Sequence, residues 1–459
     1  MRLRKRDSAL RVNGEVAVEF GNERLTSFSG LELLGRFLRR IELNPRLREA
    51  FRGQGVGGDY QLPVMIRLIV GLLWAGGRRL SHVEYLRHDE LFSRVVQLAR
   101  LPHERTLSRW LKRFRARTVA VLSRLNAAVV WETVMQLKLR RVTVDLDGTV
   151  LSTGLQVAWA QRGFNPHHRK VPSYYPIMAH IGQTGQVVKV KNRPGNVNDG
   201  TKAEWFIREV VKDARREAGK EVALEFRMDA AFFKRPVLEE LDRQGVEYGI
   251  KVPMWPWVGL KPVIQSRRRW QRMTAEISYF ETTLRLDCWE REQRVVVYRK
   301  RVWHPSRKNY QLDLFDPNDG YYEYHAMTTN KEIGPVALWH FMAGRGAQEK
   351  TIEELKNGFA FDSVPTNHYG ANSAWLQLSV LALNLFRRFQ IDTGAAKRPR
   401  SRKRTYGFRF ESIKSARFRW LNVAGRMVRT GGRLRLRLAN VPAIRRCYDR
   451  IGAALANAA

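Results

Sequence analysis

The first third of the chain has apolar residues at helical spacing. A helix is predicted over residues 31–41, where the apolar positions are Leu31, Leu33, Leu34, Phe37, Leu38 and Ile41. A second is predicted from Leu62 to Trp74, just before the Gly76-Gly77 break. A third is predicted at Ser81–Leu86, because Ser81 and Glu84 have the spacing of a capping box. Residues 1–137 are therefore predicted to be mostly helical.

Beyond residue 138 the apolar pattern changes from helical to alternating. Strands are predicted at 141–150, 174–181, 186–191, 222–228 and 246–252, with helices between the last three. A meander followed by helix, strand, helix and strand is the order of an RNase H-like mixed sheet. In that sheet the first strand lies centrally and the fourth lies beside it. The predicted fold class is therefore α/β, with an RNase H-like core that occupies residues 138–252 and continues over residues 330–393.

Residues 253–329 interrupt this alternation and are predicted to form a β-rich insertion. The segment contains strand-like pieces and five tryptophans, Trp255, Trp257, Trp270, Trp289 and Trp303. Tryptophans in a small subdomain commonly form its core, but aromatics interleaved with basic residues also suit the stacking of an unpaired base. Trp303, at a strand end beside basic residues, is the candidate for stacking.

The charge of the chain indicates its partner. Lys and Arg number 82 against 44 Asp and Glu, a formal net charge of +38, so an anionic partner is expected and nucleic acid is the leading candidate. A membrane is disfavoured, because the longest apolar run, Trp375–Phe386, is about half of the ~20 residues that span a bilayer. With Cys288 and Cys447 as the only cysteines, a cysteine-based zinc site is excluded. No export signal follows the basic start, so we expect a cytoplasmic protein.

Two basic segments are candidate DNA contacts. The predicted helix Thr106–Arg117 carries Arg109, Lys112 and Arg113, and with the preceding helix it is compatible with a helix-turn-helix. The alternative, left open by the pattern, is a small bundle in which these cations are only solvated. Residues 394–459 form a second basic region for DNA binding or dimerisation, where Arg402, Lys403 and Arg404 belong to a run too charged to fold alone.

Two acids alternate on the predicted strand Arg141–Val150. A period of two places Asp145 and Asp147 on one face of the sheet. Asp is depleted in strand interiors, and a bound Mg²⁺ would compensate its charge there. The alternative is that Asp147 caps the turn that follows. Asp229 ends the fourth strand, so the predicted sheet brings Asp147 and Asp229 together.

A third acid lies on the helix predicted after the insertion. Arg345, Glu349, Ile352 and Lys356 fall on a single helical face. A helical face with three charged residues is poorly suited to packing in a hydrophobic core. It suits a carboxylate metal ligand, Glu349, between two cations that hold DNA phosphates; the alternative is a surface ion pair between Arg345 and Glu349.

The order and spacing of these residues resemble a known family. Asp147, Asp229 and the series Arg345-x3-Glu349-x6-Lys356 are similar to the DDE transposases of bacterial insertion sequences, in the branch with a Tyr-Arg-Glu-Lys signature and within it the insertion-sequence-1380 family. Four local strings are similar too: Gly163-Phe-Asn-Pro166, Pro172-Ser-Tyr-Tyr-Pro176, Arg193-Pro-Gly-Asn196 and Arg227-Met-Asp-Ala230. The chain departs from the signature at Met342, where the family has tyrosine. The family's acid is usually followed by a small residue and then threonine, which favours Asp147, with Asp145 as the second candidate.

The resemblance implies a reaction and its requirements. Two Mg²⁺ ions, with Mn²⁺ as a substitute, would be held by Asp147, Asp229 and Glu349 for phosphodiester cleavage and transfer. The expected enzyme binds terminal inverted repeats, releases the element through hairpin ends, and joins its 3′-hydroxyls to target DNA as a homodimer. Two rivals use the same residues differently: an RNase H-like nuclease without strand transfer, and a DNA-binding protein that has lost catalysis.

Overall fold

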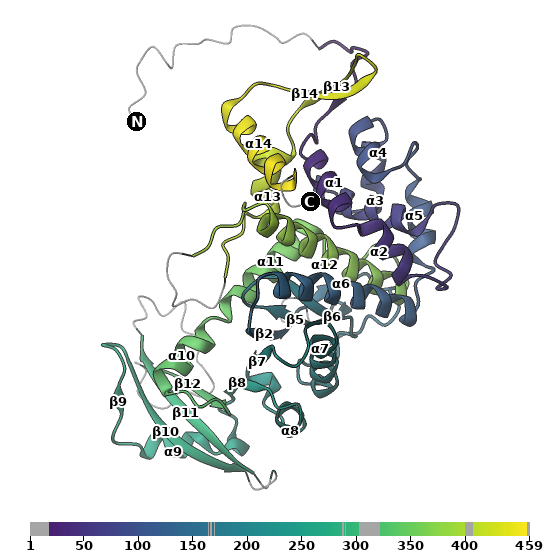
Figure 1. Ribbon diagram of the computed structural model, residues 1–459. Helices are drawn as coiled ribbons and strands as arrows, with labels where there is room; N and C mark the ends of the chain where they lie inside the picture. The colour runs from purple at the N-terminus through teal and green to yellow at the C-terminus, as the bar shows by residue number, and fades with distance from the viewer. Residues whose placement is uncertain are drawn as a thin grey trace.

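A large mixed sheet forms the centre of the protein (Figure 1). The computed structural model describes residues 18–163, 165, 168, 170–286, 289, 291–302, 322–399 and 407–456. Within them the sheet has nine strands in the order β6-β5-β2-β7-β8-β12-β11-β10-β9. Its strands are β2 (Arg141–Gly148), β5 (Ile177–Ile181), β6 (Val187–Lys191), β7 (Ala223–Met228), β8 (Glu247–Val252), β9 (Gln271–Arg272), β10 (Ile277–Leu286), β11 (Arg291–Arg301) and β12 (Tyr322–Thr329). A separate pair joins β3 (Leu151–Ser152) to β4 (Ser173–Tyr174).

The predicted order of the first five strands is confirmed. β2, β5 and β6 form an antiparallel meander, and β2 pairs in parallel with β7, which pairs in parallel with β8. β2 is therefore central, with β7 directly beside it. The carboxyl ends of β2 and β7 consequently lie at the same edge of the sheet.

The two faces of β2 are different in character, as its alternation predicts. Its apolar side chains are fully buried in the core: Val142, Val144 and Leu146. Thr143, Asp145 and Asp147 point to the opposite face. There the backbone carbonyl of Asp145 accepts a hydrogen bond from Gln348 Nε2 at 3.1 Å, so residues that follow β12 in the chain contact β2.

Helices cover both faces of the sheet (Figure 1). One core contains residues of β2, β7 and β8 together with α6 (Ala116–Gln136), α7 (Ala203–Ala218) and α8 (Arg235–Arg243). The other combines β5 and β6 with α11 (Gly346–Phe359), α12 (Tyr369–Asp392) and the N-terminal helices. Also present are the 3-10 turns η3 (Ala230–Phe232) and η4 (Pro256–Val258), and α9 (Leu260–Ser266) and α10 (Pro335–Ala343). In the described part of the chain, no helix is long and apolar enough to cross a membrane.

The N-terminal region is mostly helical but differs from the prediction in detail. Its elements are α1 (Leu31–Arg40), α2 (Leu43–Ala50), α3 (Leu62–Ala75), η2 (Leu80–Leu86), α4 (Glu90–Val96) and α5 (Glu104–Leu111). The predicted capping box is wrong, because residues 80–86 form a 3-10 helix whose N-cap is Arg79, so Ser81 lies inside it. The predicted basic helix is also too long. It ends at Leu111, and α6 begins at Ala116.

The strands of residues 253–329 extend the main sheet. β12 pairs with β8 through Thr328 and Ile250, and β11, β10 and β9 follow antiparallel. This part of the sheet projects away from the N-terminal helices (Figure 1). Its tryptophans do not share one environment, since Trp289 is buried whereas Trp257 is 48% exposed. Trp303, the predicted stacking residue, lies outside the described residues.

The two ends of the described chain meet in a second, three-stranded sheet. β1 (Leu25–Thr26) pairs with β13 (Gly425–Thr430), which pairs with β14 (Arg433–Leu438). α13 (Ile413–Ala416), the π-helix η7 (Arg417–Leu421) and α14 (Pro442–Ala456) complete this part. Arg40 Nη1 on α1 donates to the carbonyl of Ala454 on α14 at 3.2 Å, so the C-terminal segment packs on the N-terminal helices.

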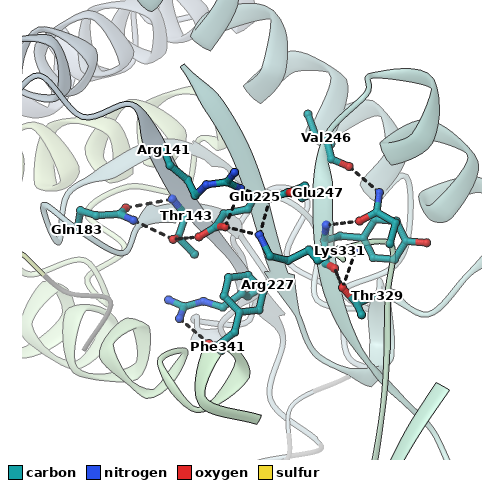
Figure 2. A network of polar contacts seen from close by, with 12 residues as sticks. Arg141, Thr143, Gln183, Glu225, Arg227, Val246, Glu247, Thr329, Lys331 and Phe341 are labelled. Carbon is teal, nitrogen blue, oxygen red and sulfur yellow. Dashed lines mark hydrogen bonds and ion pairs between the residues drawn. The ribbon is translucent and has the colours of Figure 1, made fainter. Parts of the chain in front are cut away.

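A polar network fixes the amino-terminal ends of β2, β7 and β8 (Figure 2). Lys331 Nζ donates to Glu225 on β7 at 2.6 Å and also binds Glu247 on β8. Glu225 accepts from Thr143 Oγ1 on β2 at 2.5 Å, and Arg141 pairs with Glu247. The network joins the central strands to the chain just after β12, at the end of β2 opposite Asp147. It therefore ties together the amino-terminal ends of the three strands, and Asp147 lies at the opposite, carboxyl-terminal edge of the sheet.

Candidate catalytic and metal-binding site

Asp147 and Asp229 meet at the carboxyl edge of the sheet. Asp147 is the penultimate residue of β2, and Asp229 follows the last residue of β7. Asp229 is held there as the N-cap of η3, where its Oδ1 accepts from the amide of Ala231 at 3.0 Å. Their side chains keep 17% and 30% exposure, respectively, so both are accessible from the edge. The sequence prediction that these two acids come together is confirmed.

A third carboxylate joins them from the loop between β6 and α7. One oxygen each of Asp147, Asp199 and Asp229 lies within 4.8 Å of the others. Gly148 makes this approach possible, because a Cβ there would stand 1.9 Å from Asp199 Oδ1 and 2.4 Å from Tyr175 Cε1. We call Asp147, Asp199 and Asp229 the aspartate cluster.

Arg193 holds the loop that carries Asp199. Its Nη1 donates to the carbonyls of Asn198, Asp199 and Thr201 at 3.3, 3.3 and 3.2 Å. Its Nε donates to the carbonyl of Tyr175 at 3.0 Å, and the Tyr175 hydroxyl in turn donates to Asp199 Oδ2 at 2.8 Å. The position of Asp199 is therefore set by a buried arginine and a tyrosine on the segment before β5.

Arg345 is the cation that faces the cluster. Its Nη2 lies 2.8 Å from Asp147 Oδ2 and 3.6 Å from Asp229 Oδ2. Burial raises the pKa of Asp147 to about 7; Arg345 opposes that rise, while the charges of Asp229 and Asp199 add to it. Burial also raises the pKa of Asp199. One arginine thus offsets only part of the mutual repulsion of three carboxylates.

The donor set of the cluster fits a divalent cation. All three side chains offer carboxylate oxygens, the ligands that Mg²⁺ and Mn²⁺ prefer. Asp199 Oδ1 is buried and has no hydrogen-bond partner. A buried carboxylate oxygen without a donor is costly, and a cation between the three acids would satisfy it.

Glu349, the third acid predicted from sequence, lies on α11. It is exposed on the first turn of α11, one turn after Arg345, and is not part of the carboxylate group found in the described residues. With Ile352 and Lys356 it lines a surface pocket of about 350 Å³. The predicted face of α11 is therefore present, and the acid that the structure places beside Asp147 and Asp229 is Asp199.

Asp145 is committed to a buried ion pair. Arg227 Nε and Nη2 donate to its two carboxylate oxygens at 2.6 and 2.8 Å, and both side chains are fully buried. His180 Nδ1 lies 3.4 Å from Asp145 Oδ2. Burial alone would raise the pKa of Asp145, but Arg227 and His180 hold it below its usual value. This geometry favours Asp147 over Asp145 as the metal ligand.

The predicted DNA-binding residues fall into three groups. Arg345 and Lys356 lie beside the site, and Lys356 Nζ donates to the carbonyl of Val150 at 3.1 Å, just past the end of β2. Arg109 is exposed on α5, Lys112 is half-buried after it, and Arg113 donates to the carbonyl of Gly57. Arg402, Lys403 and Arg404 lie outside the described residues, as Trp303 does.

Comparison with known families decides the identity of the chain. The family model described as Transposase DDE domain group 1 matches residues 9–459. The chain belongs to the DDE transposase family. This transposase is therefore a DNA-binding enzyme of a mobile element, and enzymes of its family use divalent metal ions. The predicted resemblance is confirmed at this level.

Solved transposase structures share only a distant likeness with this transposase. A piggyBac transposase synaptic complex with hairpin DNA has 12% sequence identity and a TM-score of 0.42, over 80% of this chain and 76% of that one. A Mos1 transposase paired-end complex with the left transposon end has 8% identity and a TM-score of 0.19, over 37% and 57%. Comparison with curated proteins finds no match.

Sequence reasoning missed Asp199 in this transposase. The helix between the third and fourth predicted strands is α7, which begins at Ala203, so Asn198-Asp199-Gly200-Thr201 belongs to the loop before it. The signal that was present is an Asp-Gly pair in a loop after a sheet strand. Gly200 permits a close approach, because a Cβ there would stand 2.3 Å from the carbonyl of Ala231 in η3, next to Asp229.

Proposed function

We propose that this transposase cleaves DNA at the ends of its element and joins the resulting 3′-hydroxyls to target DNA. The observation that carries the proposal is the placement of Asp147 and Asp229 at the carboxyl edge of two adjacent parallel strands, in a chain of the DDE family. The strand order β6-β5-β2-β7-β8 supports an RNase H-like core with residues 253–329 inserted into it. The local sequence strings support membership of the insertion-sequence-1380 branch.

Asp147, Asp229 and Glu349 are the proposed catalytic ligands for Mg²⁺. When bound, the metal supplies activation of the attacking oxygen and charge stabilisation of the leaving one. Asp147 and Asp229 are already fixed by β2 and by the η3 cap. Glu349 is exposed on the first turn of α11, where a change of rotamer alters its reach. Arg345, between the helix and the cluster, would bind a phosphate of the DNA end.

The net charge of the chain and its exposed tryptophans bear on how the protein binds DNA. The charge of +38 supports a DNA path that includes the cations around α5 and the run at residues 402–404, and it supports association with the nucleoid. We propose a homodimer that holds two transposon ends, released through hairpin intermediates. The exposed tryptophans Trp255 and Trp257, 40% and 48% exposed, add to Trp303 as candidates for stacking a base during that step.

Joining of pre-cut ends separates a transposase from a plain nuclease. We expect labelled duplexes with the element's own ends and free 3′-hydroxyls to be inserted into a plasmid in Mg²⁺ and not in EDTA, and the Glu349→Gln variant to give no joined product. The readout is labelled plasmid on a gel. Nicking without joined product would favour the nuclease. Full joining by Glu349→Gln would show that Glu349 is not a catalytic residue. DNA binding by wild type without nicking would favour a DNA-binding protein that has lost catalysis.

Lys356→Ala is expected to weaken DNA binding while the fold stays intact. Lys356 lies at the end of β2, and burial lowers the pKa of its ammonium, so this cation is costly to desolvate without an anionic partner. Loss of one phosphate contact should reduce the slope of log affinity against log salt by about 0.9. Fluorescence anisotropy at several salt concentrations measures it. Lys350→Ala, on the exposed side of the same helix, is the matched control. An unchanged slope in Lys356→Ala would contradict a contact between Lys356 and a DNA phosphate.

A further inference from the structure

One carboxylate oxygen of Asp199 accepts a hydrogen bond, and the other has no hydrogen-bond partner. Oδ2 accepts the hydrogen bond of the Tyr175 hydroxyl at 2.8 Å. Oδ1 is buried without a hydrogen-bond partner, in a side chain that is 9% exposed. It lies beside Asp147, because a Cβ on the next residue, Gly148, would stand 1.9 Å from it. Buried carboxylate oxygens are normally satisfied. This unsatisfied oxygen belongs to one of the three carboxylates that converge in the aspartate cluster.

We propose that Asp199 is a further ligand of the divalent cation that Asp147 and Asp229 hold. The inference rests on the proposed function and goes beyond it, because the catalytic set predicted from sequence contains Glu349 and not Asp199. A four-carboxylate set would give an oxygen-rich site from two strand ends, one loop and one helix. Mg²⁺ and Mn²⁺ suit such oxygen ligands.

Several independent features place Asp199 in the cluster. Gly148 leaves the space next to Asp147 that Asp199 Oδ1 fills, and any Cβ there would overlap it. Gly200 allows the loop to pack against the backbone of η3 beside Asp229. The Tyr175 hydroxyl donates to Oδ2 of Asp199, so Oδ1 is the oxygen without a hydrogen-bond partner. Together they bring a third carboxylate against two others, and because Arg345 offsets only part of that repulsion, a bound cation would be favourable there.

A purely structural role for Asp199 is the competing explanation. Arg193 Nη2 lies 3.6 Å from Asp199 Oδ1, within ion-pair range but too far for a hydrogen bond. Nε and Nη1 of the same guanidinium donate to the carbonyls of Tyr175, Asn198 and Thr201, which fixes its plane, and Nη2 is buried without a hydrogen-bond partner. Arg193 therefore shapes the loop, and the Asp199 carboxylate is not needed for that. If Asp199 only partnered Arg193, removing its charge would not affect metal binding.

The first experiment measures Mn²⁺ binding to the full-length protein without DNA. Calorimetry or electron paramagnetic resonance would compare wild type with Asp199→Asn, Asp147→Asn and the distant control Asp242→Asn, whose carboxylate pairs with Arg291. Asn keeps the shape of Asp199 and the bond from Tyr175. We expect Asp199→Asn to lower Mn²⁺ affinity about tenfold or more, and Asp242→Asn to leave it unchanged. Wild-type affinity in Asp199→Asn, with loss in Asp147→Asn, overturns the inference and leaves the proposed function standing.

A second variant tests direct contact with the metal, independently of activity. Asp199→Cys would place a soft thiolate in the cluster, and Cd²⁺ bound by a thiolate gives a charge-transfer band in the ultraviolet. We expect a Cd²⁺-dependent band above the wild-type background of Cys288 and Cys447, and Asp147→Cys serves as the positive control. A band in Asp147→Cys without one in Asp199→Cys overturns the inference. Failure of wild type to bind Mn²⁺, and of both cysteine variants to give the band, would overturn the proposed metal site itself.

Discussion

Replacing Asp147 with asparagine is expected to abolish cleavage of transposon-end DNA. Asp147 lies at the end of the central strand, beside Asp229, with Arg345 Nη2 2.8 Å from its Oδ2. The amide keeps the shape but removes the charge that would hold the metal. We expect the single-turnover nicking rate to fall by about 10³-fold or more, which corresponds to ~4 kcal/mol of transition-state stabilisation. DNA binding should be retained, because the cations of the DNA path are unchanged.

The Asp242→Asn variant is the control for this prediction. Asp242 is a carboxylate on α8 that pairs with Arg291 at 2.6 Å, and it is 39% exposed. Its replacement should leave nicking within about twofold of wild type, as surface ion pairs contribute little. If Asp147→Asn nicked at the wild-type rate and Asp145→Asn did not, the assignment of the β2 ligand would have to move to Asp145.

Arg227→Met is expected to cause the largest loss of stability in the catalytic core. Arg227 and Asp145 form a bidentate pair between β7 and β2, and both are fully buried. Removing the guanidinium leaves a buried carboxylate uncompensated, which costs about 3–5 kcal/mol. It also removes the donor to the carbonyl of Phe341, 2.8 Å away on α10. Urea denaturation, with the midpoint and slope measured together, would report the change.

Two variants make the stability prediction specific. Arg235→Met removes an arginine whose pair with Glu239 is exposed, so its expected cost is about 0–1 kcal/mol. Asp145→Leu combined with Arg227→Met removes both buried charges and should recover a large part of the loss. A cost below about 1 kcal/mol for Arg227→Met alone would contradict the view that this pair is dry and structural.

The central sheet could be predicted because its signals are local. In β2 the apolar residues Val142 and Val144 alternate with the polar residues that face α11, and the positions of the helices between later strands fix the order of the sheet. Asp147 and Asp229 each end a strand, so the parallel pairing of β2 with β7 was sufficient to bring them together.

The rest depended on tertiary contacts that no local pattern encodes. Asp199 reaches the cluster because Arg193 gathers three loop carbonyls and because Gly148 leaves room, and neither effect has a period in the sequence. The 3-10 form of residues 80–86 was missed for a similar reason. Glu84, predicted to complete a cap, instead pairs with Arg87 at 2.6 Å and accepts from the backbone amide of Glu104 at 3.3 Å.

The pairing of β12 with β8 was also beyond local prediction. The strands of residues 253–329 were correctly expected to be strands, but sequence gives no register between segments this far apart. In the structure Thr328 faces Ile250 across an antiparallel pair, and Lys331 then turns back to Glu225 on β7. The buried ion pair between Lys331 and Glu225 links the β-rich segment to the core.

Metal-dependent nicking of a labelled duplex is the most direct test of the central claim, that the acids at the carboxyl edge of β2 and β7 break phosphodiester bonds. The duplex carries one end of the element with flanking DNA, and wild type and Asp229→Asn are compared in Mg²⁺, in EDTA, and after Mg²⁺ is restored. We predict a nick at the element boundary by wild type in Mg²⁺, its loss in EDTA, its return with Mg²⁺, and none by Asp229→Asn. A nick that persists in EDTA, or that Asp229→Asn makes at the wild-type rate, would contradict the account.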